Sequence, residues 1–242
     1  MIHRPGTSSS RLPQLLPLLL LLLSGLFAGS ALAATTVVLD AGHGGFDKGG
    51  VPGMRLVEKN FTLDVARRVR ANLQAAGVRT VMTRSTDTFV ELRDRCAIAN
   101  RQPKAVFVSI HFNAAPREGA CGIETYYYRG PASASLAAAI HREVVRRTGA
   151  QDRGVRTCRY YVLRNTRIPA VLAELGFLTN KAEGSRISSS AYRDKLAQGI
   201  ARPLIARYAP KPTTSQQAPA IPTRKTTPSQ GTSRRPLGPE SR

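Results

Sequence analysis

Apolar residues along the chain fall into two patterns: short continuous runs, and stripes with a spacing of about four residues. Continuous runs of four to eight apolar or β-branched residues are typical of strands whose two faces are both covered. A spacing of three to four residues is typical of helices that bury one face. The runs predict six strands, at Thr36–Asp40, Val78–Thr83, Ala105–Ile110, Ile123–Tyr128, Tyr160–Leu163 and Ala170–Leu175.

Helical stripes lie between and after these runs. They predict helices over Phe61–Leu73 ended by Gly77, from a capping box at Thr88-x-x-Glu91 to about Asn100, over Leu136–Val144 ended by Gly149, and over Tyr192–Leu204 with a kink at Pro203. Alternation of strands with helices is typical of α/β proteins. The predicted fold is therefore a single three-layer α/β domain, with a mostly parallel sheet and helices on both faces.

Both ends of the chain depart from this pattern. Residues 1–33 combine a positive start, the apolar run Leu15–Ala28 and the small-x-small residues Ala31-Leu32-Ala33, as secretory signal peptides do. The run is shorter than the roughly 20 apolar residues of a membrane-spanning helix, so we expect cleavage near Ala34 and no membrane anchor afterwards. The predicted location is periplasmic, secreted or cell-wall associated. Residues 209–242 are rich in Pro, Ser, Thr and basic residues, which predicts a disordered basic tail.

Composition narrows the class of the predicted domain, residues 34–208. An apolar share of 42% excludes a wholly disordered chain, and three cysteines without a CxxC pair exclude a disulfide scaffold or zinc finger. The domain carries 28 basic and 14 acidic residues, a net charge of +14. Such charge is typical of nucleic-acid binders, but an exported protein meets little nucleic acid. We expect no nucleic-acid partner, and attraction to anionic envelope polymers instead.

Four polar residues come from distant parts of the chain but fall at one edge of the predicted sheet. His43 and His111 each follow a strand, Glu174 ends a strand, and Glu58 opens the first helix. In such sheets, functional groups gather beyond the carboxyl ends of the strands. Two histidines and one carboxylate form a catalytic zinc set with a fourth position for water. A second carboxylate beside the metal can act as general base.

Each of these residues has a simpler interpretation when it is taken alone. A histidine after a strand is more often a loop residue than a ligand, and Glu58 fits a favourable charge at a helix N-terminus. Glu174 is harder to explain this way, because an unpaired carboxylate in a buried strand costs on the order of several kcal/mol. The loop Gly42–Asp47 lacks the third glycine of GxGxxG and a following GK[ST], which argues against phosphate binding. We expect its glycines to let the backbone place His43.

The remaining histidine and the cysteines carry two further expectations. His141 lies on the predicted helix Leu136–Val144 and is expected at the surface or its boundary. Cys121 and Cys158 each precede a short predicted strand, so they would lie within bridging distance if those strands are neighbours. Cys96 would then remain a free thiol.

Five motifs follow one another in a fixed order. They are Asp40–Gly45 (DAGHGG), Glu58–Asn60 (EKN), Ser109–Ala114 (SIHFNA), Gly122–Tyr127 (GIETYY) and Pro169–Asn180 (PAVLAELGFLTN). In this order they resemble the zinc-dependent N-acetylmuramoyl-L-alanine amidases of the AmiC/CwlV type (amidase_3), which are bacterial cell-wall hydrolases. The resemblance covers about residues 35–208. Phe112 and Ala173 stand where the family often has Ala and Val.

The resemblance implies a metal site and a reaction. It implies that His43, Glu58 and His111 bind one zinc ion and that Glu174 is the catalytic carboxylate. The implied reaction cleaves the amide between the lactyl group of N-acetylmuramic acid and L-alanine of the stem peptide, so peptidoglycan is the expected substrate. Polar neighbours that could orient ligands or substrate are Asp40, Asn113 and Glu124.

Two other classes of function remain open. Another secreted zinc hydrolase of the cell wall, a carboxypeptidase or a deacetylase, would share the metal chemistry. A non-catalytic wall-binding module would be expected to lack Glu174 or a ligand, whereas this sequence has all four residues.

Regulation is the last expectation. Some relatives insert a long segment, with a helix that plugs the zinc site, after the GxETYY strand. Here only Arg129–Ser135 separates that strand from the next helical stripe, and isolated helices shorter than about 12 residues are marginal. We therefore expect an open cleft and a monomer that needs no obligatory activator.

Overall fold

Six strands and six helices lie along residues 35–116 and 119–211, the part of the chain that the computed structural model describes. The predicted signal peptide and nearly all of the predicted tail lie outside this part. The strands are β1 (Thr36–Ala41), β2 (Thr80–Met82), β3 (Ala105–Asn113), β4 (Ile123–Tyr127), β5 (Asp152–Thr157) and β6 (Ala170–Phe177). The helices are α1 (Glu58–Ala75), α2 (Leu92–Asn100), α3 (Pro131–Thr148), α4 (Tyr161–Asn165), α5 (Lys181–Ser188) and α6 (Ser190–Tyr208).

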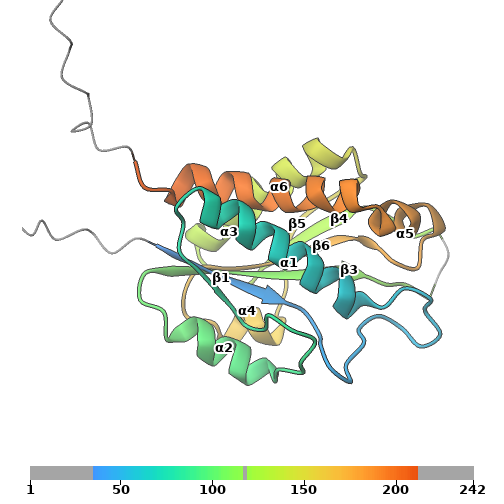
Figure 1. The fold of residues 1–242 in the computed structure, drawn as a ribbon, viewed down its shortest axis with the longest axis horizontal. Coiled ribbons are helices and arrows are strands. Elements are labelled where there is room, and N and C mark those ends of the chain that lie inside the picture. The colour runs from blue at the N-terminus through green and yellow to red at the C-terminus, as the bar shows by residue number, and fades with distance from the viewer. Residues whose placement is uncertain (1–34, 117–118, 212–242) are drawn as a thin grey trace, which may run out of the picture. The chain divides into compact units, whose positions relative to one another are not determined.

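The strands form one sheet in the order β2-β1-β3-β6-β4-β5. All neighbouring strands pair in parallel except β4 and β6, which are antiparallel. Figure 1 shows α1, α3 and α6 on one side of the sheet and α2 and α4 on the other. The predicted three-layer α/β fold with a mostly parallel sheet is confirmed. No helix in the described ranges is long and apolar enough to cross a bilayer.

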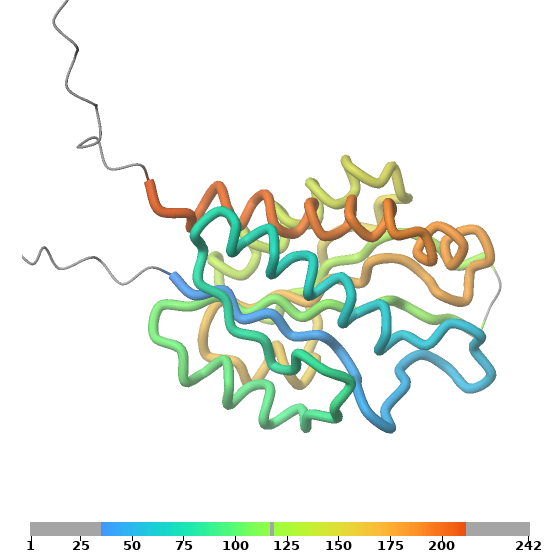
Figure 2. The backbone as a smooth tube through the Cα atoms, viewed as in Figure 1, coloured from blue at the N-terminus to red at the C-terminus, as the bar shows by residue number. Residues whose placement is uncertain are grey.

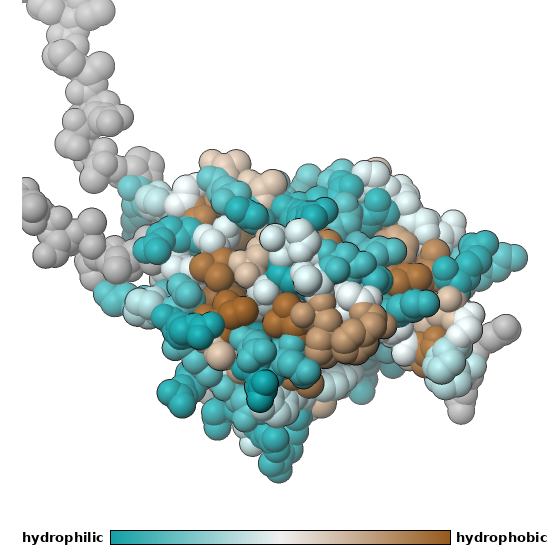
Figure 3. Space-filling model, turned by 60° about the horizontal axis from the view of Figure 1, so that its bottom comes forward, coloured by the Kyte–Doolittle hydropathy of each residue, from teal (hydrophilic) through white to brown (hydrophobic). Residues whose placement is uncertain are grey.

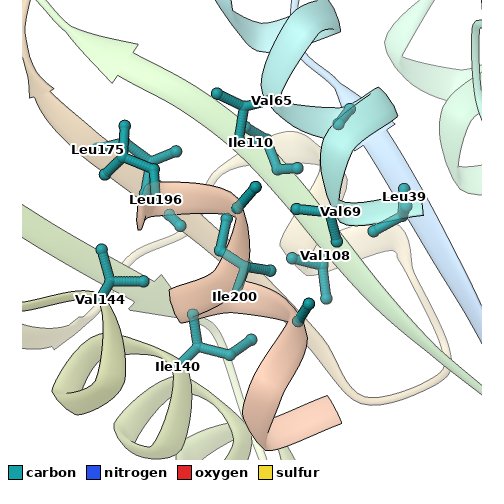
Figure 4. Close-up of a cluster of buried hydrophobic side chains, with 14 of the residues drawn as sticks. Leu39, Val65, Val69, Val108, Ile110, Ile140, Val144, Leu175, Leu196 and Ile200 are labelled. Atoms are coloured by element: carbon teal, nitrogen blue, oxygen red, sulfur yellow. The ribbon is translucent and has the colours of Figure 1, made fainter. Parts of the chain in front are cut away.

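Apolar burial explains why the inner strands form where they do. All six residues of β1 are buried, as a strand covered on both faces requires. The stripe of α1 that includes Val65 and Val69 packs against the sheet together with Leu196 and Ile200 of α6 (Figure 4). Helices α1 and α6 lie side by side although they are far apart in sequence (Figure 2). Each such side chain stabilises the fold by roughly 1.5–3 kcal/mol when fully buried.

The predicted strand at Tyr160–Leu163 is wrong, because Tyr161–Asn165 forms the short helix α4. A four-residue apolar run does not distinguish a strand from a helical turn. In this run Val162 and Leu163 are consecutive and both buried, whereas a half-buried strand would bury alternate residues. The strand that takes its place is β5, whose sequence DRGVRT is polar because it lies at the sheet edge.

Several element ends also differ from the predictions. The capping box at Thr88 is absent, since its hydroxyl contacts that of Thr86 and α2 begins only at Leu92. Strands β3 and β6 run beyond their apolar cores, so that His111 and Glu174 lie inside paired strands rather than at their ends. Helix α5 was not predicted. The sequence does mark the start of this helix, because Asn180 is followed three residues later by Glu183, the spacing of a capping box. In the structure the side chain of Asn180 accepts a hydrogen bond from the backbone N–H of Glu183.

Candidate metal centre

Three side chains converge beside the carboxyl ends of the central strands. His43 lies in the loop after β1, Glu58 is the first residue of α1, and His111 lies near the end of β3. Nε2 of His43 lies 3.1 Å from Oε2 of Glu58, and Nδ1 of His111 lies 3.1 Å from Oε1 of the same carboxylate. One potential ligand atom from each residue lies within 4.8 Å of the other two. The fold thus brings together the three residues that the sequence analysis predicts as metal ligands.

The backbone packs tightly against these side chains at two glycines. A Cβ atom on Gly42 would collide with the imidazole of His111. A Cβ atom on Gly49 would lie 2.5 Å from Oε2 of Glu58 and 2.6 Å from Cδ2 of His43. His43 itself has a φ of 59°, a conformation that non-glycine residues adopt rarely and at functional sites. The glycines of this loop therefore permit the close approach of backbone to the three side chains.

The charges within the cluster stabilise one another. Burial alone would raise the pKa of Glu58, but hydrogen bonds with His111 and His43 lower it to about 2. Burial would lower the pKa of His43, yet its hydrogen bond with Glu58 raises that pKa to about 9. The backbone N–H of Phe112 also donates to Oε1 of Glu58 at 2.9 Å. The carboxylate of Glu58 is thus ionised at the centre of the site, and because it is buried, positive charge beside it is stabilising.

Glu174 lies in the same row of side chains as His111. The parallel register pairs it with His111 on β3, and the antiparallel register pairs it with Glu124 on β4. Oε2 of Glu174 is buried without a hydrogen-bond partner. Burial raises the pKa of Glu174 to about 7, with His111 opposing the shift and Glu58 adding to it. A buried carboxyl group with a pKa near neutrality has the properties of a general acid or base.

Two buried arginines fix the loop that carries His43. Arg95 of α2 donates to Oδ1 of Asp40 at 2.8 Å and to the carbonyl of His43 at 2.8 Å. Arg84 donates to the carbonyls of Ala41 and Gly42 at 2.9 and 2.8 Å. Asp40, which the sequence suggested as a neighbour of the ligands, therefore acts on them through Arg95. The two arginines were missed, because a basic residue near a turn has no pattern that distinguishes it from a solvated one.

A second polar network lies on the other side of Glu174. Oε2 of Glu124 accepts hydrogen bonds from Nδ2 of Asn113 at 3.1 Å and from the hydroxyl of Tyr126 at 2.8 Å. Its Oε1 accepts from Nε of Arg153 on β5 at 3.0 Å. Asn113 and Glu124 were expected to orient ligands or substrate, and in the structure their hydrogen bonds join them to each other rather than to the three converging side chains.

The cluster opens into a cavity of about 610 Å³. His43, Glu58, His111 and Glu174 line it together with apolar side chains of the segments before α2 and around α4. Three large apolar residues on its wall are partly exposed, Leu92 (51%), Tyr160 (39%) and Tyr161 (41%). Apolar patches interrupt the hydrophilic surface in Figure 3. Exposed apolar groups gathered at a concave polar site are typical of ligand binding.

His141 lies elsewhere, and its predicted position is wrong. It is buried, with 5% exposure, rather than at the surface. Its Nδ1 lies 3.1 Å from the hydroxyl of Thr125, and its Nε2 lies 2.7 Å from Oδ1 of Asp152. These contacts tie α3 to β4 and β5 and compensate its burial.

The suggested bridge between Cys121 and Cys158 is also wrong, and both thiols are free. Cys121 precedes β4, whereas Cys158 follows β5 instead of preceding a strand. The two strands are parallel, so the cysteines lie at opposite ends of the pair. At about 3.3 Å per residue their separation exceeds roughly 13 Å, which is beyond the limit of about 7 Å for Cα atoms joined by a disulfide.

Comparison with known proteins places this geometry in a family. A family model for N-acetylmuramoyl-L-alanine amidases (Amidase_3) matches residues 37–206. The N-acetylmuramoyl-L-alanine amidase LytC of Bacillus subtilis (strain 168) is 38% identical over 176 residues, which are 72% of this chain and 35% of LytC. The chain therefore matches about a third of the length of that relative.

Among the solved structures that share the fold are two amidases. The catalytic domain of CwlV, an N-acetylmuramoyl-L-alanine amidase from Bacillus (Paenibacillus) polymyxa var. colistinus, is 39% identical with a TM-score of 0.68, over 72% of this chain and 97% of that one. The CwlD amidase of Clostridioides difficile, solved in complex with the GerS lipoprotein, is 27% identical with a TM-score of 0.67, over 72% and 98%. The implied family is thereby confirmed: this chain belongs to the N-acetylmuramoyl-L-alanine amidase family.

Proposed function

We propose that this chain is a zinc-dependent enzyme that cleaves the amide between N-acetylmuramic acid and L-alanine of the peptidoglycan stem peptide. The observation that carries the proposal is the convergence of His43, Glu58 and His111 beside the unpartnered carboxylate of Glu174. His43, Glu58 and His111 would hold one zinc ion, and Glu174 would be the catalytic residue.

The residues fit zinc in number and kind. Two imidazole nitrogens and one carboxylate are a common donor set of catalytic zinc sites, which keep a further position open. Glu58 supplies the negative charge, and the collisions expected at Gly42 and Gly49 indicate that the backbone is shaped to keep the three donors together. The cavity leaves the donors accessible from solvent, as a catalytic rather than a structural site requires.

The mechanism assigns separate tasks to the ion and to the chain. Bound zinc lowers the pKa of water toward about 7 and polarises a carbonyl oxygen. Glu174, which lines the cavity, would accept a proton from the attacking water and then deliver a proton to the leaving nitrogen of L-alanine. The exposed apolar wall around Leu92 and Tyr161 would contact apolar parts of the substrate.

Regulation by a blocking segment is not part of this proposal. Strand β4 ends at Tyr127 and α3 begins at Pro131, which leaves three residues between them and no room for an inserted helix. The chain would act as a monomer without an activator. CwlD, by contrast, is a relative whose structure includes a lipoprotein partner. The net charge of the domain and the leader-like residues 1–33 support export and attraction to the anionic envelope.

Digestion of isolated peptidoglycan by the purified protein, residues 34–242, tests the proposal. Mass spectrometry should find stem peptides with a free L-alanine amino group, and these products should vanish in excess chelator and return with added zinc. Full activity in a chelator with zinc shown absent contradicts the metal mechanism. Released D-alanine or acetate would indicate a carboxypeptidase or a deacetylase instead. Activity that appears only after addition of envelope extract contradicts independence from an activator.

A further inference from the structure

Asp47 is a carboxylate beside the metal centre that the proposed mechanism leaves unused. Its Oδ2 lies 2.8 Å from Nδ1 of His43, and its Oδ1 accepts the backbone N–H of Gly49 at 3.0 Å. Because an ionised carboxylate only accepts hydrogen bonds, Nδ1 of His43 carries the hydrogen. The other ring nitrogen, Nε2, is the one that faces Glu58. Asp47 therefore determines which nitrogen of His43 is available to a cation.

The second contact of Asp47 bears on Glu58. Gly49 packs so closely that a Cβ atom there would lie 2.5 Å from Oε2 of Glu58 and 2.6 Å from the ring of His43. The hydrogen bond from Gly49 to Asp47 holds this stretch of backbone in place. The main chain of Asp47 also closes the turn, by two hydrogen bonds with Gly44 at 3.0 and 3.2 Å. The carboxylate of Asp47 thus restrains the ring of His43 and also the backbone at Gly49, which packs against Glu58.

The two histidines of the cluster differ in this respect. His111 lies on a paired strand, so its backbone is fixed by the sheet. His43 lies in a glycine-rich loop and has a positive φ. Of the two, His43 is therefore the one whose backbone the sheet does not fix and whose second ring nitrogen contacts a further carboxylate, Asp47. Carboxylates that accept the second N–H of a ligating histidine commonly fix its tautomer and orientation, and their loss weakens metal affinity by about 10–100-fold.

We propose that Asp47 is a positioning residue for the metal, acting through His43 and through the backbone at Gly49. The inference rests on the zinc site proposed above. Asn at this position has the same shape but only one acceptor oxygen, so Asp47→Asn must leave either the Nδ1 hydrogen of His43 or the N–H of Gly49 without its partner. The same substitution also removes the negative charge that supports the imidazole as a ligand.

Zinc affinity, measured by competition with a chromophoric chelator, tests this inference without use of activity. We expect Asp47→Asn to weaken zinc binding by about 10–100-fold, with the thermal unfolding of the metal-free protein nearly unchanged. The matched control is Asp87→Asn. Asp87 also accepts two hydrogen bonds at this loop, from the N–H of Gly45 at 2.9 Å and from Lys59 at 2.6 Å, but contacts none of the three ligands. Its substitution should leave zinc affinity unchanged.

The other outcomes are decisive as well. Equal affinity of the wild type and Asp47→Asn overturns the inference, and so does an equal loss in Asp47→Asn and Asp87→Asn, which would indicate a general effect of loop charge. If Asp47→Asn does not fold, Asp47→Glu moves the carboxylate by one methylene. A weakened affinity then supports the inference, and an unchanged affinity contradicts it. A wild type that binds no zinc contradicts the proposed metal centre itself.

Discussion

Two carboxylate–arginine pairs flank the candidate site, and they differ in how much water reaches them. On the side of β1, Oδ1 of Asp40 lies 2.8 Å from Nη1 of Arg95; the side chain of Asp40 is 1% exposed and that of Arg95 is 3% exposed. On the side of the edge strand β5, Oε1 of Glu124 lies 3.0 Å from Nε of Arg153; the side chain of Glu124 is 4% exposed and that of Arg153 is 31% exposed. The first pair is removed from water entirely, whereas the arginine of the second remains partly solvated.

The two pairs also hold different parts of the molecule. Arg95 reaches the carbonyl of His43 and so fixes the backbone that carries a candidate metal ligand. Arg153 contacts the ring of Phe177 and the carboxylate of Glu124, and none of its contacts reaches the three converging side chains. A desolvated pair costs much when one partner is removed, and a partly solvated pair costs less. The β1 side of the site is therefore the side where loss of one partner is expected to cost more stability.

Glu174 lies where the two sides meet, and its substitution should have the largest effect. We expect Glu174→Gln to lower the rate of peptidoglycan hydrolysis by at least about 100-fold, because the glutamine cannot accept a proton. Zinc affinity should stay near that of the wild type, since Glu174 is not among the proposed ligands. Rates and zinc content measured on the same preparation check this. A fully active Glu174→Gln enzyme would sink the assignment of the general base.

Asp40→Asn sharpens the contrast between the pairs and should come next in size. It leaves the Arg95 charge buried without its partner, which costs about 3–5 kcal/mol of unfolding free energy. Burial would raise the pKa of Asp40, but Arg95, Ser109 and Thr83 lower it below its usual 3.8. A lowered folded-state pKa contributes stability that is present above the unfolded-state pKa and is lost as the pH falls through the folded-state value.

Urea unfolding at several pH values measures this contribution. The wild type should lose stability below about pH 4, and Asp40→Asn should lack the part of this loss that belongs to Asp40. If the wild type and Asp40→Asn lose the same amount of unfolding free energy as the pH falls, Asp40 does not make the predicted pH-dependent contribution to stability.

The inner strands and the edge strand β2 could be predicted from the sequence, whereas the other edge strand, β5, could not. Strands β1, β3 and β6 are covered on both faces, so their sequences are continuous apolar runs. Strand β5 lies at the edge and is mostly polar, so DRGVRT does not have the apolar pattern of a strand. The nearby run at Tyr160–Leu163 has that pattern but forms the start of α4. A strand that is buried on both faces needs apolar residues along its whole length, and this apolar run can be recognised in the sequence. An element with little burial has no such requirement and therefore no such run.

The site shows the same division. The positions of His43, Glu58, His111 and Glu174 follow from strand ends and motifs, and the fold brings all four together. Arg84, Arg95 and Asp47 could not be found in this way, because their roles arise from contacts with main-chain atoms of a loop with unusual backbone angles. Such contacts depend on the folded path of the loop rather than on residue spacing.

Glu124→Gln tests the solvated side of the comparison and should have a smaller effect than Asp40→Asn. We expect a loss of about 1–3 kcal/mol of unfolding free energy, because a buried acceptor of three hydrogen bonds is replaced while Arg153 can turn to water. Zinc affinity should not change. Glu143→Gln on α3 is the control, since its pairs with Arg146 and Arg147 lie near the surface. A loss as large as that of Asp40→Asn would break the distinction between the two sides.

The smallest effects are expected at Cys121 and Cys158, on the same side as Glu124. Because parallel pairing of β4 and β5 puts the two thiols at opposite ends, each Cys→Ser substitution should change the unfolding free energy by less than about 0.5 kcal/mol. Loss of a native disulfide would instead cost about 2–5 kcal/mol. Cys96→Ser should cost more than either, because Cys96 is buried among apolar side chains.

Thiol titration in denaturant, on protein isolated without reductant, should count three thiols per chain. A count of one would mean that two cysteines are joined, and a bridge between Cys121 and Cys158 is incompatible with parallel β4 and β5.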